Sequence, residues 1–120
     1  IFSPCALGAV INDDTLDVLK VDIVAGAANN QLAEARHGKV LHERGIVYAP
    51  DYVINAGGIC NVFGELEGWT AEQSMEKAGG IYECLLLVLG QALAEDIPTS
   101  EAADRMARQR IAEARRARDA

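Results

Sequence analysis

Two short apolar runs with a helix-forming stretch between them constrain the fold of this chain more than any other feature. Residues 21–25 are closed by Gly26 and residues 46–49 by Pro50, so each run is predicted to be a buried strand. Residues 29–42 between them are predicted to be helical. A strand, a helix and a strand in this order form a unit whose two strands run parallel and are joined by a right-handed crossover. The sequence therefore predicts an α/β fold.

The rest of the chain is predicted to be mainly helical. Asn12 is placed to cap a short helix, and Asp51 to cap a helix over residues 52–66. A capping-box sequence at residues 70–73 predicts a long helix after it, and a last helix follows. The long helix is expected to bury a stripe that consists of Met75, Ala78, Tyr82, Leu85, Leu86, Leu89 and Leu93. The expected architecture is two or three parallel strands followed by carboxyl-terminal helices.

The beginning of the chain suggests that a longer protein surrounds it. Residues 1–4 read as the end of a strand followed by a loop, and a natural domain seldom begins in that way. A sheet of two or three strands also has an exposed edge, which is a liability unless something covers it. The 120 residues are enough for one compact domain. We therefore expect a fragment of a longer protein.

Charge, hydropathy and cysteine spacing exclude several classes of protein. Residues 1–100 carry five Lys/Arg and 14 Asp/Glu, whereas residues 101–120 carry six Arg and four Asp/Glu. The acidic body argues against a nucleic acid partner, and for the arginines of the tail we favour pairing with acidic side chains over contact with RNA. No apolar run approaches the roughly 20 residues that span a bilayer, so a cytoplasmic protein without a membrane partner is expected. Cys5, Cys60 and Cys84 lack the spacing of a metal site or disulfide framework, so we expect reduced thiols and no metal.

Small and amide side chains follow directly after each predicted strand, in residues 4–8, 26–30 and 49–58. In an open parallel sheet, ligands bind outside the carboxyl ends of the strands, so these segments are expected to line one crevice. Asn29 and Asn30 offer hydrogen-bond donors and acceptors without adding charge. The alternative for Asn29 is that it caps the following helix.

Gly57 and Gly58 need a reason of their own, because they lie inside a predicted helix. Each costs on the order of 1 kcal/mol there relative to Ala. A ligand or a second backbone that approaches them would explain the cost, and close packing of helices explains it equally well. Taken alone, the residues predict half of a ligand-binding α/β domain and no specific reaction.

Three segments carry a resemblance to a known family. The sequences PCALG at residues 4–8, VAGAANNQL at residues 24–32 and GIVYAPDYVINAGG at residues 45–58 closely resemble the Glu/Leu/Phe/Val dehydrogenases, and the similarity runs over nearly the whole chain. Leucine and valine dehydrogenases are the most similar branch. The resemblance implies that residues 1–66 are the second half of an NAD-binding, Rossmann-like domain. Residues 67–120 would be carboxyl-terminal helices that pack on it.

The same resemblance implies where the cofactor binds. Cys5, Ala6, Asn29, Asn30 and Asn55 match positions close to the nicotinamide and ribose of NAD, and Asn30 lies where the nicotinamide meets the substrate. The family's catalytic lysines and its glycine-rich phosphate loop match no residue of this chain and would lie upstream, in an amino-terminal catalytic domain and the first half of the nucleotide domain. The chain by itself is therefore expected to be inactive.

Two further positions bear on the substrate. Val62 aligns with a serine that holds the side-chain carboxylate of the substrate in glutamate dehydrogenases. An apolar Val62, with Ile59 one helical turn before it, cannot satisfy a buried charge and suits a branched aliphatic side chain. Leucine enzymes of the family usually have Val where this chain has Ile59, and the added methylene is expected to narrow the pocket towards valine.

The reaction implied by the resemblance is reversible oxidative deamination. A branched-chain L-amino acid (leucine, valine or isoleucine) would be converted to its 2-oxo acid and ammonia with NAD as hydride acceptor, in a whole protein that is expected to be a homo-oligomer. Two alternatives stay open. One is a phenylalanine dehydrogenase, and the other is a non-catalytic nucleotide-binding or assembly module on the same scaffold.

Overall fold

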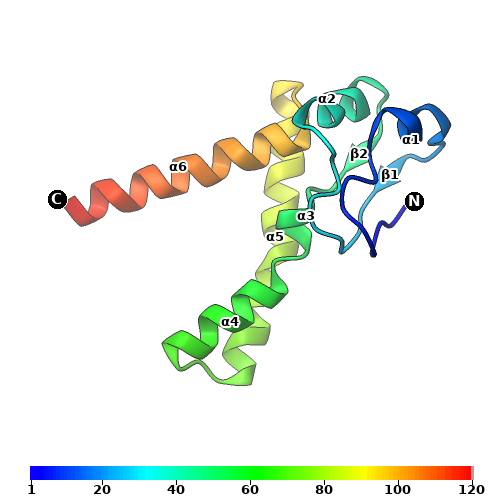
Figure 1. Cartoon of the computed structure of the whole chain (residues 1–120). Helices are drawn as coiled ribbons and strands as arrows, with labels where there is room; N and C mark the ends of the chain where they lie inside the picture. The colour runs from blue at the N-terminus through cyan, green and yellow to red at the C-terminus, as the bar shows by residue number, and fades with distance from the viewer. Residues whose placement is uncertain (120) are drawn as a thin grey trace.

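The structure, a computed structural model, describes residues 1–119. It contains two short strands and six helices within the described residues, and from the small parallel sheet the α4/α5 pair extends in one direction and α6 in another (Figure 1). In chain order the elements are α1 (Asp13–Val18), β1 (Ile23–Val24), α2 (Ala35–Glu43), β2 (Val47–Tyr48), α3 (Asp51–Ile54), α4 (Gly57–Glu67), α5 (Ala71–Glu95) and α6 (Thr99–Asp119).

The sheet is parallel, as the strand–helix–strand spacing predicts. β1 and β2 pair with Ile23 opposite Val47. Phe2 adds a third parallel segment on the other side of β1, because its N–H donates to Ile23 O at 2.9 Å and its carbonyl accepts from Ala25 N–H at 3.0 Å. The expected two or three parallel strands followed by carboxyl-terminal helices are therefore confirmed, and the sheet is part of a Rossmann-like fold.

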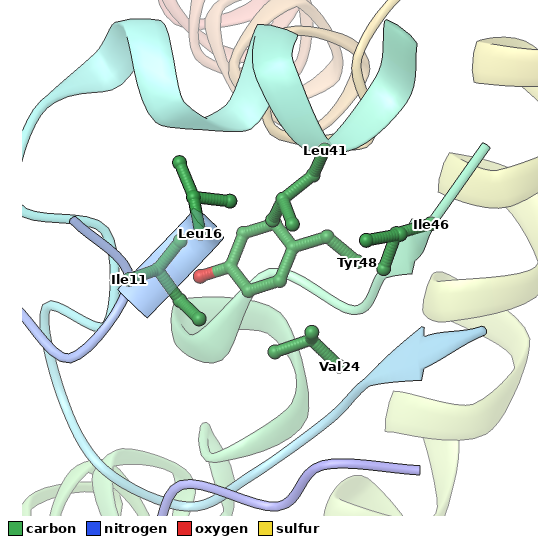
Figure 2. Close-up of a cluster of buried hydrophobic side chains, with 6 residues drawn as sticks. All are labelled: Ile11, Leu16, Val24, Leu41, Ile46 and Tyr48. Carbon is green, nitrogen blue, oxygen red and sulfur yellow. The ribbon is translucent and has the colours of Figure 1, made fainter. Parts of the chain in front are cut away.

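The core of this part of the molecule lies between the sheet, α1 and α2. Its buried residues are Ile11, Leu16, Val24, Leu41, Ile46 and Tyr48. Figure 2 shows the Tyr48 ring between Leu41 and Val24 in the middle of this cluster. β-branched residues and an aromatic ring fill the space between sheet and helix, and each two-residue strand buries one side chain there, Val24 in β1 and Tyr48 in β2, while Val47 is exposed. Asn12 caps α1 as predicted, with its side chain accepting from Thr15 N–H at 3.0 Å.

The helix predicted for residues 29–42 begins later than expected, at Ala35, and its N-cap is Glu34. Residues 29–34 instead form an irregular loop. The buried Gln31 side chain stabilises the turn before it, because its Nε2 donates to Gly26 O at 2.6 Å and to Ala28 O at 2.9 Å. These side-chain hydrogen bonds compete with helix formation, so the helix begins at a later residue. The interpretation of Asn29 as a helix cap is therefore wrong.

The helix predicted for residues 52–66 is two helices. α3 ends at Ile54, and α4 begins at Gly57 after a break at Asn55 and Ala56. Gly57 and Gly58 are therefore the first residues of α4 and not interior positions, so their cost in helix stability is smaller than expected. A Cβ on either glycine would meet no described atom within 4 Å, so close helix packing within residues 1–119 does not explain them.

α4 and α5 form an antiparallel pair that extends from the sheet, while α6 projects in another direction (Figure 1). The predicted capping box of α5 is present, with Thr70 and Gln73 bonded to each other's backbone. α5 and α6 meet through a second core of Val88, Ala92, Ala102 and Ala103. Small side chains let the two helices approach closely at this crossing.

The apolar stripe predicted for α5 is mostly not buried within the described chain. Met75, Tyr82, Leu86 and Leu93 are exposed. α5 is also long and apolar enough, by length and composition only, to cross a membrane, because it has 25 residues and contains an 18-residue window with a mean hydropathy of 1.3, of which 11% is buried. The sequence does not predict such a helix, because its longest apolar run, residues 81–89, is short and interrupted by Glu83. The absence of a membrane partner stays a prediction, as does the division at residues 66 and 67.

Candidate functional site

Two loops at the carboxyl ends of neighbouring strands pack tightly against each other. Ala28 N–H donates to Pro4 O at 2.9 Å, and Ala9 N–H donates to Asn30 O at 2.6 Å. Gly26 lies so close to Pro4 that a Cβ there would be 2.1 Å from the Pro4 carbonyl oxygen. Residues 4–9 and 26–30 therefore form one continuous edge of the sheet, as predicted from the parallel strands.

Cys5 and Ala6 are exposed within this edge. The pKa of the Cys5 thiol lies below its ordinary value, chiefly because Ala27 N–H donates to the sulfur and also because Ser3 hydrogen-bonds to it, with Ser3 Oγ 3.4 Å from Cys5 Sγ. Ala6 adds no bulk beyond its methyl group, and small residues let a flat ring approach the backbone.

The side-chain amides of Asn29 and Asn55 are hydrogen-bonded to each other. Asn55 Nδ2 donates to Asn29 Oδ1 at 2.7 Å and lies 3.3 Å from Ala27 O. Asn55 is the C-cap of α3, so the pair joins that short helix to the loop after β1. Because Asn29 Oδ1 already accepts, its Nδ2 group is the part that can donate to a ligand.

Asn30 has an unusual backbone conformation, with φ at +54°. Its N–H donates to Asp51 Oδ2 at 2.8 Å and its carbonyl accepts from Ala9 N–H. Its side chain is exposed and makes no hydrogen bond to any residue between 1 and 119. The Asn30 amide can therefore both donate to a ligand and accept from one.

Asp51 and Tyr48 also belong to this site. Asp51 lies in the segment 49–58 that is predicted to line the crevice, but neither residue is predicted to have a role in the site. Tyr48 O–H donates to Asp51 Oδ1 at 2.6 Å, and both residues are buried, with exposed fractions of 2% and 6% for Tyr48 and Asp51. Burial and the bond to Asp51 raise the pKa of the Tyr48 hydroxyl. The prediction that Asp51 caps a helix is wrong, because Pro50 is the N-cap of α3. The feature that could have indicated this pair is an acidic residue just after a predicted strand, three residues beyond a tyrosine.

The two predicted substrate residues lie on α4, beyond the break at Asn55. Ile59 and Val62 are 71% and 58% exposed. They are three residues apart and so share one side of α4, whose main packing partner is α5. The structure thus brings Cys5, Ala6, Asn29, Asn30 and Asn55 together at one edge of the sheet, and exposes Ile59 and Val62 on α4.

A second polar cluster lies away from this edge and has the residue types of a metal site. Asp13, Glu34 and His37 place their ligand atoms within 4.8 Å of one another. However, the Arg36 guanidinium bonds to both carboxylates, at 2.6 Å from Asp13 Oδ2 and 3.0 Å from Glu34 Oε1. His37 Nδ1 accepts from Glu34 N–H at 3.0 Å, and its Nε2 lies 3.4 Å from Asp13 Oδ1, so the histidine is also engaged within the cluster. This cluster is an ion-pair network.

Comparison with known proteins places these features in a family. A family model described as Glutamate/Leucine/Phenylalanine/Valine dehydrogenase matches residues 1–119. The chain is 58% identical over 118 residues to a leucine dehydrogenase of Thermoactinomyces intermedius, covering 98% of this chain and 32% of that protein. It is 51% identical over 115 residues to a valine dehydrogenase of Streptomyces coelicolor, covering 96% and 32%.

A solved structure has the same arrangement of elements. The L-tryptophan dehydrogenase from Nostoc punctiforme superposes with a TM-score of 0.90 at 43% sequence identity, covering 96% of this chain and 35% of that one. The chain spans about a third of the length of the curated relatives it matches. Because the family model covers the described residues from end to end, the chain belongs to the Glu/Leu/Phe/Val dehydrogenase family.

Proposed function

We propose that the whole protein catalyses the NAD-dependent oxidative deamination of a branched-chain L-amino acid. In this reaction bound NAD would supply the hydride acceptor for the α-carbon, the amino group would lose a proton, and water would then release ammonia and leave the 2-oxo acid. The observation that carries the proposal is the edge of small and amide residues formed by residues 4–9, 26–30 and Asn55, in a chain 58% identical to a leucine dehydrogenase.

The edge fits a dinucleotide because it combines uncharged donors and acceptors with little side-chain bulk. Asn29 Nδ2 and the Asn30 amide can bond to the carboxamide and ribose hydroxyl groups of NAD without adding charge. Cys5 and Ala6 leave room for the flat nicotinamide ring. Of the five proposed cofactor residues only Cys5 is titratable. The site therefore binds and orients, and the acid–base groups of the reaction are supplied by residues outside this chain.

The preference for a branched-chain substrate rests on α4. Ile59 and Val62 present hydrocarbon to the side of α4 that they share, and their exposure in the described chain leaves that face available to a ligand. An apolar face favours leucine, valine or isoleucine over glutamate, because a buried carboxylate without a partner is costly. The 51% identity to a valine dehydrogenase supports the same class of substrate.

An activity assay with NAD and a panel of L-amino acids tests this proposal. We expect the whole protein to reduce NAD fastest with leucine, valine or isoleucine. Val62→Ser is expected to lower kcat/KM for these substrates by about tenfold, because it removes apolar contacts and introduces a hydroxyl. The matched control is Val18→Ser on α1, an exposed valine outside the proposed site, which is expected to leave kcat/KM unchanged.

The panel also decides between the alternatives. Highest activity with phenylalanine would replace the branched-chain assignment with an aromatic one. Activity confined to glutamate would overturn the role of Val62. NAD binding without turnover of any amino acid would indicate a non-catalytic module.

A further inference from the structure

We propose that α3 fixes the conformation of the cofactor-binding loop at residues 26–30, a role that we call the brace. Asp51 is the positioning residue of this helix. This inference rests on the proposed function, because a loop of fixed conformation favours cofactor binding only if Asn29 and Asn30 bind the cofactor. The helix contacts the loop at both of its ends. Its first residue, Asp51, bonds to the backbone of Asn30, and its C-cap, Asn55, bonds to the side chain of Asn29.

The loop needs such a contact because of the backbone at Asn30. Its φ of +54° lies in the left-handed region, which costs a residue with a side chain energy relative to glycine. The conformation is retained because both neighbouring peptide groups are held. The Asn30 N–H donates to Asp51 Oδ2 at 2.8 Å, and the Asn30 carbonyl accepts from Ala9 N–H at 2.6 Å.

The other end of α3 fixes the neighbouring side chain. Asn55 N–H donates to Asp51 O at 2.9 Å, which closes the single turn of helix between them. Asn55 Nδ2 then donates to Asn29 Oδ1 at 2.7 Å. One helical turn therefore fixes the backbone conformation of Asn30 and the orientation of the Asn29 side-chain amide. Asn29 and Asn30 are the residues proposed to bind the cofactor.

Asp51 itself is held from the core. Its Oδ1 accepts from Tyr48 O–H at 2.6 Å, and Tyr48 belongs to the buried cluster between the sheet and α2 (Figure 2). Thr99 Oγ1 donates to Tyr48 O at 2.5 Å, which ties the strand to the start of α6. The hydrogen bonds of Tyr48 to Asp51 and of Asp51 to Asn30 thus connect the buried core to the loop.

The position requires a carboxylate and not merely a polar side chain. Asp51 accepts one hydrogen bond on each oxygen, from Asn30 N–H and from Tyr48 O–H. An asparagine in its place has one acceptor oxygen, so one of the two donors would lose its partner. Hydrogen bonds to a charged acceptor are also stronger than those to a neutral one. A role in capping α3 does not explain the residue, since both of its oxygens are used elsewhere.

Asp51→Asn in the whole protein tests the brace, with Thr99→Val as a matched control. Thr99→Val removes a hydrogen bond to the same Tyr48 and leaves the contacts of Asp51 intact. We expect Asp51→Asn to raise the KM for NAD by about tenfold, the size expected for one lost hydrogen bond to a charged group. We expect Thr99→Val to lower the melting temperature and leave the KM for NAD unchanged.

Hydrogen exchange of residues 27–31 supplies a second readout that does not depend on activity. Asp51→Asn is expected to speed exchange at the Asn30 N–H, and Thr99→Val is not. Tyr48→Phe removes the hydroxyl that donates to Asp51 Oδ1 at 2.6 Å and accepts from Asp51 N–H at 3.3 Å, but leaves the Asp51 carboxylate in place for Asn30 N–H, so it is expected to give a smaller rise in KM of about threefold. This milder variant decides the question if Asp51→Asn does not fold.

The outcomes separate the brace from the proposed function. Equal KM values and equal exchange in Asp51→Asn and Thr99→Val overturn the brace, whatever the enzyme's substrate. A wild-type protein that turns over no amino acid overturns the proposed function. In that case, faster exchange in Asp51→Asn still supports the brace, and unchanged exchange refutes it.

Discussion

Gly26 lies at the point where the loop after β1 crosses the loop before Ala6. A Cβ at Gly26 would be 2.1 Å from Pro4 O and 2.5 Å from Pro4 N, and both of these are backbone atoms that cannot rotate away. We expect Gly26→Ala to lower the free energy of unfolding by about 3 kcal/mol or more, because overpacking against backbone forces the chain to shift. Urea denaturation of the whole protein, wild type and variant, measures the difference.

Gly57→Ala is the control for that substitution. A Cβ on Gly57 would meet no described atom within 4 Å, and Gly57 is the first residue of α4. Alanine there is expected to change the free energy of unfolding by less than about 1 kcal/mol, and in the stabilising direction, since alanine favours the helix. A Gly26→Ala protein as stable as Gly57→Ala would show that the two loops do not need to cross so closely.

Arg36 joins two elements, because it bonds to Asp13 on α1 and to Glu34 at the start of α2. Its two Nη atoms contact both oxygens of Asp13, at 2.8 and 2.6 Å, and its Nε lies 3.1 Å from Glu34 Oε2. Arg36 therefore holds the pKa of both carboxyls below their ordinary values, with its hydrogen bond as the largest cause in each case. Carboxyls of this kind stabilise the folded state while they are ionised.

The sign of this effect predicts a pH dependence. A carboxyl with a lowered folded pKa contributes stability above its unfolded pKa, near pH 4, and loses it as pH falls through the lower folded value. Arg36→Gln is therefore expected to be less stable than wild type at neutral pH, with the difference disappearing in acid and shrinking in high salt. Thermal melts across pH measure it. Lys39→Gln, which removes a single long ion pair at 3.7 Å, is the control and is expected to show almost no difference.

Local pattern predicts the elements of this chain where local forces form them. The strands follow from β-branched runs, and the caps of α1 and α5 follow from Asn12 and Thr70. The start of α2 could not be predicted, because Gln31 bonds back to two carbonyls in the preceding loop. Nor could the burial of α5, since periodicity shows which side of a helix is apolar and not what covers it.

The same distinction applies to the candidate site, where the local sequence indicates some residues and contacts between distant residues determine others. Asn29, Asn30 and Asn55 could be predicted because polar residues after parallel strands gather at one edge. The contact of Asp51 with Asn30 joins residues 21 positions apart through a left-handed backbone, and no local spacing indicates it. The position of Val62 relative to the amides stays a prediction, because α4 begins only after the break at Asn55.

At the scale of the whole molecule, the described chain has more apolar surface than one compact body can cover. The exposed large side chains of α4 and α5 are Ile59, Val62, Phe63, Leu66, Met75, Tyr82, Leu86, Leu87 and Leu93. They extend over a pair of helices that stands away from the sheet (Figure 1). Apolar patches of this extent mark surfaces that contact something else. The chain spans about a third of its relatives' length.

This surface predicts how the 120 residues behave when they are produced alone. We expect them to associate as concentration rises, because joining two apolar faces removes both from water at about 25 cal/mol for each Å² buried. Light scattering measures the mass. Leu86→Glu with Leu87→Glu on α5 should shift the population towards monomer, since burying an unpaired carboxylate opposes the contact. Val18→Glu on α1 adds a charge to an exposed apolar residue of another helix and should leave the mass unchanged. A monomer at every concentration would mean that the helices of the free chain fold back over their own apolar faces.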